Sequence, residues 1–129
     1  MGEDATLGLV LWATDIPALS AFIEAVGGFA IEERHPGYAS LLKQGARIVL
    51  HDDESYRGHP WFNALRKEGV ARGIGAEIDI AVDDVAAAYQ AALRLGGLSI
   101  QPPYESEGRE ECHVMGPDGY VFSCWRRHA

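Results

Sequence analysis

The chain has 129 residues, 47% of them hydrophobic and 23% charged, which suits a single soluble domain with a buried core. Its formal net charge of −8, with no cluster of Lys and Arg, argues against a nucleic-acid partner. No apolar run approaches the roughly 18 residues of a membrane span, the first residues lack a secretory pattern, and two cysteines are too few for a disulfide scaffold. We therefore expect a cytoplasmic protein without a membrane partner.

Two segments of the chain follow the same pattern. Residues 8–28 align with residues 77–97 without a gap, and each reads as a strand followed by an amphipathic helix. Asp15 and Asp84 are expected to cap the two helices at their N-termini, and paired glycines end both helices. The sequence therefore predicts an internal duplication.

Each copy continues into three further strands. The expected strands are residues 7–13, 29–34, 38–43 and 46–51, then 76–82, 98–101, 111–115 and 120–126. A turn at residues 116–119 closes the last hairpin, which pairs residue 112 with residue 123. We expect one domain over residues 1–129, with repeat one at 5–52, a linker at 53–74 and repeat two at 75–127. The predicted fold class is α+β, with two tandem βαβββ repeats forming a curved mixed sheet around a cavity and helices on its outer face.

Strand alternation separates the side chains that pack on the helices from those that face the cavity. The second group mixes aromatic, acidic and small polar residues: Trp12, Val49, His51, Glu77, Asp79, Ser123 and Trp125. This set is too polar for a core and too aromatic for a solvated face, so it resembles the lining of a ligand pocket. A solvated outer face with the two tryptophans at a dimer interface is the alternative.

One cysteine is a candidate nucleophile. In the predicted hairpin Cys112 faces the cavity near Ser123, where His51 or His113 could activate its thiol. The other cysteine, Cys124, is most simply a small core residue.

Two carboxylates are a candidate acid–base pair. Glu77 and Asp79 lie on the same face of one strand, near enough to perturb each other. The alternative is that Arg47 or Arg109 neutralises them.

Five short motifs occur in an order that is typical of one superfamily. They are Thr14-Asp15, Gly27-Gly28-Phe29, Val82-Asp83-Asp84-Val85, Gly108-Arg109-Glu110 and Gly116-Pro117-Asp118-Gly119-Tyr120. Over nearly its whole length the chain resembles the vicinal-oxygen-chelate superfamily, which includes glyoxalase I, extradiol dioxygenases and bleomycin-resistance proteins. The resemblance implies the fold and leaves the function open, because one fold hosts many chemistries.

Metal-dependent members of the superfamily carry their ligands at four inward positions, which the resemblance puts at Gly8, Val49, Glu77 and Ser123. Only Glu77 has a side chain suited to a divalent ion, whereas such a site needs about three or four protein donors. The resemblance therefore implies neither a metal nor another cofactor. A weak metal site at His51 and Glu77, displaced from these four positions, is left open.

Without a metal, the chain most closely resembles the bleomycin-resistance-type members of the superfamily, which are acidic homodimers that sequester a cationic antibiotic. It implies a homodimer that binds a small cationic or aromatic ligand against aromatic rings and carboxylates. The ligand contacts then add four residues to the cavity set: Trp61, Phe62, Arg109 and Cys112.

Two other functions are open. One is an enzyme on the same fold (a lyase, isomerase or dioxygenase) that uses Glu77 as an acid–base group or residual metal ligand. The other is an interaction module in which Trp12 and Trp125 serve only dimer contacts.

Overall fold

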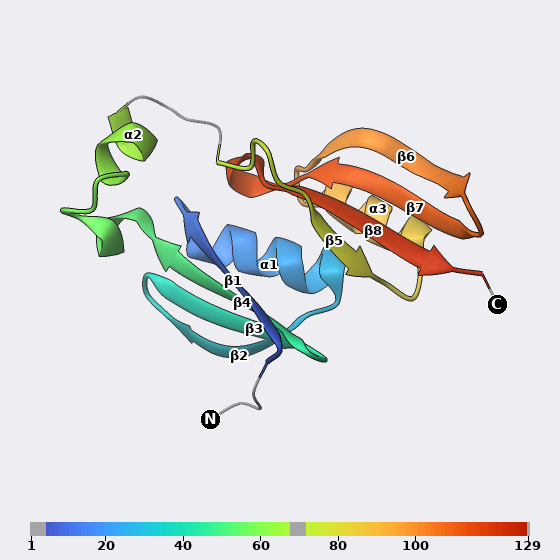
Figure 1. Ribbon diagram of the computed structural model, residues 1–129, viewed down its shortest axis with the longest axis horizontal. Helices are drawn as coiled ribbons and strands as arrows, with labels where there is room; N and C mark the ends of the chain where they lie inside the picture. Colours follow the sequence, from blue (N-terminus) through green and yellow to red (C-terminus); the bar gives the residue numbers. More distant parts are fainter. Residues whose placement is uncertain (1–4, 68–71, 129) are drawn as a thin grey trace.

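A computed structural model describes residues 5–67 and 72–128, which form two similar halves (Figure 1). The first half contains β1 (Leu7–Ala13), α1 (Ile16–Gly27), β2 (Ala30–His35), β3 (Tyr38–Lys43) and β4 (Ala46–Asp52). The second half contains β5 (Ile78–Ala81), α3 (Val85–Arg94), β6 (Leu98–Ser106), β7 (Arg109–Met115) and β8 (Val121–Arg127). Between the halves lie the 3₁₀ helix η1 (Asp53–Tyr56) and α2 (Phe62–Lys67), and a second 3₁₀ turn, η2 (Pro117–Gly119), precedes β8.

Each half forms its own four-stranded mixed sheet. The strand orders are β1-β4-β3-β2 and β5-β8-β7-β6, in which β1 is parallel to β4, β5 is parallel to β8, and the other neighbours are antiparallel. The predicted α+β class with two tandem βαβββ halves is confirmed. The sheet is divided into two, because β1 and β5 are both edge strands and no backbone ladder joins them within residues 5–67 and 72–128.

The two main helices begin at the predicted caps. A carboxylate oxygen of Asp15 accepts the N–H of Ala18, and one of Asp84 accepts the N–H of Ala87, each at 3.0 Å. α1 ends at Gly27, and Gly28 follows it in the left-handed region at φ 74°, where a side chain would be strained. None of the helices in the described part of the chain is long and apolar enough to cross a membrane.

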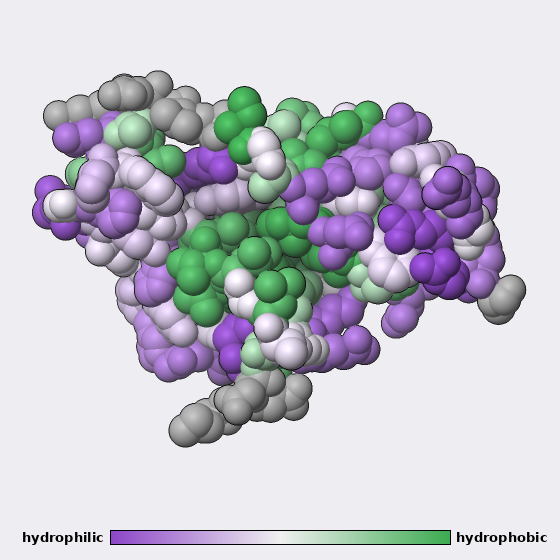
Figure 2. Space-filling view, viewed as in Figure 1, coloured by the Kyte–Doolittle hydropathy of each residue, from purple (hydrophilic) through white to green (hydrophobic). Residues whose placement is uncertain are grey.

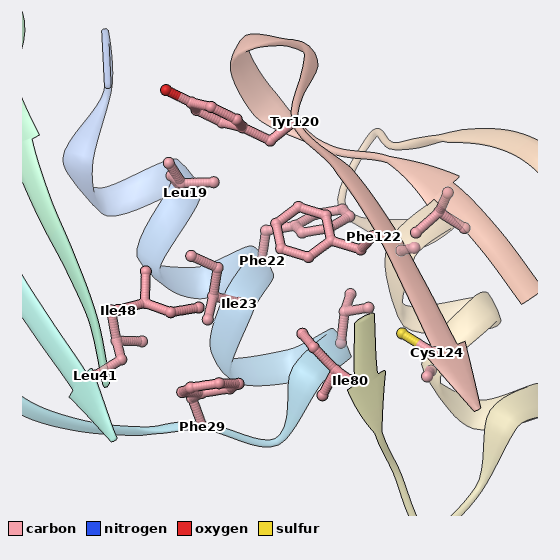
Figure 3. Close-up of a cluster of buried hydrophobic side chains, with 14 of the residues drawn as sticks. Leu19, Phe22, Ile23, Phe29, Leu41, Ile48, Ile80, Tyr120, Phe122 and Cys124 are labelled. Atoms are coloured by element: carbon pink, nitrogen blue, oxygen red, sulfur yellow. The ribbon is translucent and has the colours of Figure 1, made fainter. Parts of the chain in front are cut away.

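Both halves pack on α1. Figure 3 shows Leu41 and Ile48 of the first sheet on one side of α1, and Ile80 and Phe122 of the second sheet on the other. Phe22 of α1 is fully buried, and its ring centroid lies 5.3 Å from that of Phe122. α1 also contacts α3. A shared core therefore joins the halves, and removing a buried phenylalanine ring from such a core costs roughly 3–5 kcal/mol.

A buried ion pair ties the linker to the rest of the fold. The guanidinium of Arg72 donates two hydrogen bonds to the two carboxylate oxygens of Asp53, each at 2.7 Å. Arg72 Nε also lies 3.9 Å from Asp118, which accepts hydrogen bonds from the backbone N–H and the hydroxyl of Thr14 at 3.0 and 2.8 Å. The linker, the end of β1 and the loop before β8 are thereby held together.

The hairpin between β7 and β8 has a longer loop than the sequence predicts. Its loop spans residues 116–120 and is closed by a hydrogen bond from the Gly116 N–H to the Tyr120 carbonyl at 2.8 Å. Cys112 therefore pairs with Cys124, and the prediction that residue 112 pairs with residue 123 is wrong. A shift of one residue moves Cys112 to the other face of the sheet, because side chains alternate along a strand.

Strand β6 is longer than the predicted residues 98–101. It continues through Pro102 and Pro103 with two register shifts against β7, and the turn at Glu107 and Gly108 follows it. Two prolines are compatible with this strand because it lies at the edge of its sheet, where one row of N–H groups is not needed for pairing.

Candidate functional site

An apolar groove lies between the edge strands β1 and β5, where the two sheets do not join. Its volume is about 800 Å³, which is typical of a small-molecule site. Figure 2 shows hydrophobic side chains gathered in a hollow at the centre of this face. Most of the lining is aliphatic, and the residues with aromatic or charged side chains are Trp12, Trp61, Arg72, Glu77, Asp79 and Tyr120.

Trp12 forms a flat aromatic wall on the β1 side of the groove. Its ring stacks on Tyr56, with centroids 3.5 Å apart and an interplanar angle of 12°. Tyr56 comes from η1, where Asp52 accepts the N–H of Ser55 at 3.1 Å and so caps the turn that returns Tyr56 to β1. Because Trp12 lines the groove and Tyr56 does not, Tyr56 supports the indole from behind. Trp61 lies 5.9 Å from Trp12 and is 65% exposed.

Two histidine rings extend this aromatic cluster. The ring of His59 lies 5.1 Å from Trp12, and its Nδ1 accepts the backbone N–H of Trp61 at 3.0 Å. The ring of His51 lies 5.7 Å from Tyr56 in an edge-on arrangement. Burial raises the pKa of Tyr56, so its phenol stays neutral. These contacts hold the tryptophans in a defined orientation before any ligand arrives.

The β5 side of the groove carries the carboxylates of Glu77 and Asp79. The Glu77 side chain is 46% exposed, and its Oε2 lies 2.9 Å from Nδ1 of His113 on β7. The other ring nitrogen of His113, Nε2, lies 3.2 Å from Oε1 of Glu111 and 3.0 Å from the hydroxyl of Tyr104. The imidazole is therefore placed between two carboxylates, one on each nitrogen.

Glu111 is the buried end of this network. Arg109 Nε donates to its Oε2 at 2.9 Å, and the Tyr104 hydroxyl donates to its Oε1 at 2.9 Å. The Arg109 guanidinium first, and the Tyr104 hydroxyl second, hold the pKa of Glu111 below its usual range. The same hydrogen bond to Glu111 raises the pKa of Tyr104. Glu111 is thus a carboxylate that accepts hydrogen bonds on both oxygens.

The structure brings four of the predicted site residues together in the groove: Trp12, Trp61, Glu77 and Asp79. Val49 and His51 lie on the same face of the first sheet as Trp12 but do not line the groove.

The other predicted contacts lie elsewhere. The ring of Phe62 contacts the guanidiniums of Arg57 and Arg66, each 5.5 Å from its centroid. Ser123 is only 2% exposed. The guanidinium of Arg109 lies 4.6 Å from the ring of Trp125, on the second sheet.

Cys112 does not face the groove, which corrects the sequence prediction. Its side chain is fully buried on the helix side of the second sheet beside Cys124. The hydrogen bond with Cys112 and burial raise the pKa of Cys124. Both thiols are buried and neither has access to a ligand in the groove, so the candidate nucleophile is ruled out at this position.

Sequence reasoning missed Tyr56, Tyr104 and Glu111, assigned no role to His59, and considered His113 only as an activator of Cys112. The signal for the β7 residues was present, because alternation puts Glu111 and His113 on one face of β7 and Cys112 on the other. The error of one residue in the hairpin register reversed the two faces.

The residues at the four positions implied for a metal do not fit one. Gly8 and Val49 have no donor atom in their side chains, Ser123 is buried, and Glu77 is engaged by His113. Across residues 5–67 and 72–128 no group of three or more His, Cys, Asp or Glu side chains is arranged to hold an ion. Of the displaced pair, His51 packs edge-on against Tyr56 and does not line the groove, whereas Glu77 lines it and bonds to His113.

Neither a family model nor a curated protein matches the sequence. Solved structures do match the fold. A glyoxalase/bleomycin resistance protein/dioxygenase family enzyme from Burkholderia phytofirmans PsJN is 24% identical, with a TM-score of 0.74 over 97% of this chain and 99% of that chain. A glyoxalase-related enzyme from Fulvimarina pelagi is 16% identical, with a TM-score of 0.72 over 98% and 89%.

A glyoxalase/bleomycin resistance protein from Albidiferax ferrireducens T118 is 14% identical, with a TM-score of 0.69 over 93% of this chain and 96% of that chain. The matches span nearly the full length of each protein, so the two halves are arranged alike in all of them. The chain thus has the fold of the glyoxalase/bleomycin resistance protein/dioxygenase proteins.

Proposed function

We propose that the chain binds a flat small organic molecule in the groove between β1 and β5, with one ring of the ligand against Trp12. The observation that carries this proposal is that Tyr56 supports the ring of Trp12 from behind. Tyr56 stacks on Trp12 at 3.5 Å, and the indole borders an apolar space of about 800 Å³. An aromatic surface that is already oriented loses little conformational entropy when a planar ligand stacks on it.

We propose a cationic aromatic ligand in preference to an anionic one. Glu77 and Asp79 border the groove, and the formal net charge of the chain is −8. Arg72 also borders it, but both of its terminal nitrogens are bound to Asp53. Sequestration of a cationic compound, as implied by the resemblance to bleomycin-resistance proteins, is the form of this function that we favour, with the cytoplasm as its compartment.

Calorimetric titration with proflavine, a planar cation, tests the proposal. We expect a dissociation constant below about 100 μM, roughly −5.5 kcal/mol. Trp12→Leu should weaken binding by about tenfold, because it removes the stacking surface. Trp125→Leu is the matched control, since Trp125 does not line the groove, and its affinity should stay within about twofold. Equal losses in both variants, or no binding by the unchanged protein, would overturn the proposal.

The charge preference has its own test. Asp79→Asn should weaken proflavine binding and reduce its dependence on salt, because it removes a carboxylate beside the cation. The planar compound quinoxaline, which is uncharged at pH 7, should bind both proteins alike. If Asp79→Asn leaves proflavine unaffected, the ligand is bound by stacking alone and the cationic preference is wrong.

We also propose a homodimer in which a second copy covers part of the open groove. Apolar side chains along it are unusually exposed: Leu7 at 63%, Val10 at 58% and Ile74 at 80%. Contiguous apolar surface of this kind on a soluble domain is typical of an interface. Light scattering coupled to size exclusion should give twice the chain mass, and Val10→Lys should give the monomer. A monomer that binds proflavine with full affinity would exclude the dimer and leave the binding proposal intact. A dimer that binds none of these compounds would favour the interaction module.

A further inference from the structure

A second pocket, on the helix side of the molecule, contains the amine of Lys43. The pocket has a volume of about 540 Å³ and is lined by α1, α3 and the residues that follow β5. It shares no lining residue with the groove, and ligand binding in the groove leaves it without a role. Lys43 ends β3 and is partly buried. The sequence contains one other lysine, Lys67.

Two backbone carbonyls hold this amine in place. Nζ of Lys43 donates a hydrogen bond to the carbonyl of Gly27, at the end of α1, at 2.8 Å, and another to the carbonyl of Ala81, at the end of β5. In the described part of the chain no third acceptor bonds to Nζ. A neutral amine has two N–H donors and one lone pair, so the two carbonyls satisfy both donors and leave the lone pair unused. The lone pair is the part of an amine that attacks an electrophile.

The surroundings favour the neutral, nucleophilic form of this amine. Burial lowers the pKa of Lys43, and the negative charge of Asp83 opposes this effect without cancelling it. The titratable groups that face the amine are Asp83, which follows β5, and Cys124 of β8, while Asp84 and Arg94 border the same pocket. A lysine that is partly withdrawn from water in a pocket is typical of amines that act as nucleophiles.

We propose that Lys43 is a modification site, at which Nζ takes an acyl group from a small, uncharged acyl thioester. In this step the lone pair of Nζ bonds to the carbonyl carbon of the thioester, the C–S bond breaks, and its electron pair leaves with the sulfur. The nitrogen loses one proton, which the sulfur takes. The products are an amide and a thiol, and no other reactant is needed.

The two carbonyls and the pocket define the class of the modifying group. An amide keeps one N–H, so one carbonyl stays bonded, whereas an imine formed with an aldehyde would leave both carbonyls without a donor. The lining includes small aliphatic side chains such as Val26 and Ala91, which suit a short acyl chain. The formal net charge of −8 disfavours an anionic donor such as an acyl phosphate. Because Gly27 and Ala81 belong to different halves, acylation removes one link between the halves.

Acetylation by S-acetyl-N-acetylcysteamine, a small uncharged thioester, tests the proposal. Mass spectrometry of the digested protein gives the rate at each lysine near neutral pH. We expect Lys43 to react at least about fivefold faster than Lys67, because each unit by which a pKa falls raises the neutral fraction of an amine about tenfold. In concentrated urea the two lysines should react alike. A rate at Lys43 no higher than at Lys67 in the native protein, or a difference that persists in urea, overturns the proposal.

Two matched variants of α3 test the pocket itself. Ala87 lines the pocket and Ala86 does not, although both side chains are exposed. Ala87→Phe should slow the acetylation of Lys43 several-fold by filling part of the pocket, whereas Ala86→Phe should leave the rate unchanged. Equal rates in the two variants would mean that the thioester does not reach Lys43 through this pocket, and would overturn the proposal.

Asp83→Asn tests the electrostatic environment of the amine. It removes the negative charge that raises the pKa of Lys43, so the acetylation of Lys43 should become faster while that of Lys67 does not change. An unchanged or slower rate at Lys43 would show that the amine does not react from this environment, and would overturn the proposal.

Discussion

Replacing Arg72 by methionine should destabilise the protein strongly, because it leaves two buried carboxylates without their cation. Arg72 and Asp53 are each less than a tenth exposed, and the two hydrogen bonds between them are 2.7 Å long. Asp118 lies 3.9 Å from the same guanidinium. Removing one member of a buried pair typically costs about 3–5 kcal/mol, and we expect Arg72→Met to fall in this range. With an unfolding slope of about 1.5 kcal/mol/M, the urea midpoint should fall by about 2–3 M.

Urea unfolding followed by tryptophan fluorescence measures this loss, and Arg57→Met is the control. Arg57 pairs with Glu54 at the surface, where the same substitution should cost less than about 1 kcal/mol. The double variant Arg72→Met/Asp53→Asn should lose about 1–3 kcal/mol less unfolding free energy than the two single variants lose together, because it removes one of the carboxylates that Arg72→Met leaves unpaired. A loss in Arg72→Met no larger than in Arg57→Met would show that the buried pair adds nothing and that this reasoning is wrong.

Three further predictions concern the core and the sheets. Gly97→Ala should cost about 1–3 kcal/mol in the same assay, because its new Cβ would meet two backbone oxygens at 2.8 and 3.0 Å and the Phe22 ring at 3.0 Å; an unchanged midpoint would contradict this. Hydrogen bonds from Arg47 first, and from Ser40 second, lower the pKa of Glu32 from 4.5 to about 2. The ionised Glu32 therefore stabilises the fold fully above about pH 4.5, and this stabilisation is lost as the pH falls toward 2. Between about pH 5 and pH 3 the unfolding free energy of Glu32→Gln should therefore fall less than that of the unchanged protein, and equal slopes would count against the pair. Cys112 and Cys124 should react with a disulfide reagent only after unfolding, and rapid reaction of either thiol in the native protein would be inconsistent with their burial.

Much of the fold could be predicted from the sequence, because its signals are local. Asp15 and Asp84 cap their helices through their own side chains, and both caps are found as predicted. The gapless match between the two βα segments depends only on spacing along the chain, and it correctly indicates two similar halves. The division into two sheets was not predictable in this way. It depends on how both halves pack on α1, around contacts such as Phe22 with Phe122, which lie far apart in the sequence.

The candidate site was predictable in part. Alternation along single strands selected Trp12, Glu77 and Asp79, and the structure brings all three to one groove. Alternation could not show which side chains of β7 face the helices, because the register of β7 against β8 depends on the length of the hairpin loop. Tyr120 ends that loop and donates its hydroxyl to the Trp12 carbonyl at 2.7 Å, a contact between the two halves.

The sequence by itself determined the elements, their order and the duplication, because caps, periodicity and turns act over a few neighbouring residues. Tertiary structure alone decided which side chains meet. It set Tyr56 behind Trp12, and it set His113 between Glu77 and Glu111 through a register that one loop residue can reverse. Contacts between distant segments follow from the packing of the whole chain, so only the three-dimensional structure shows which side chains lie together at this groove.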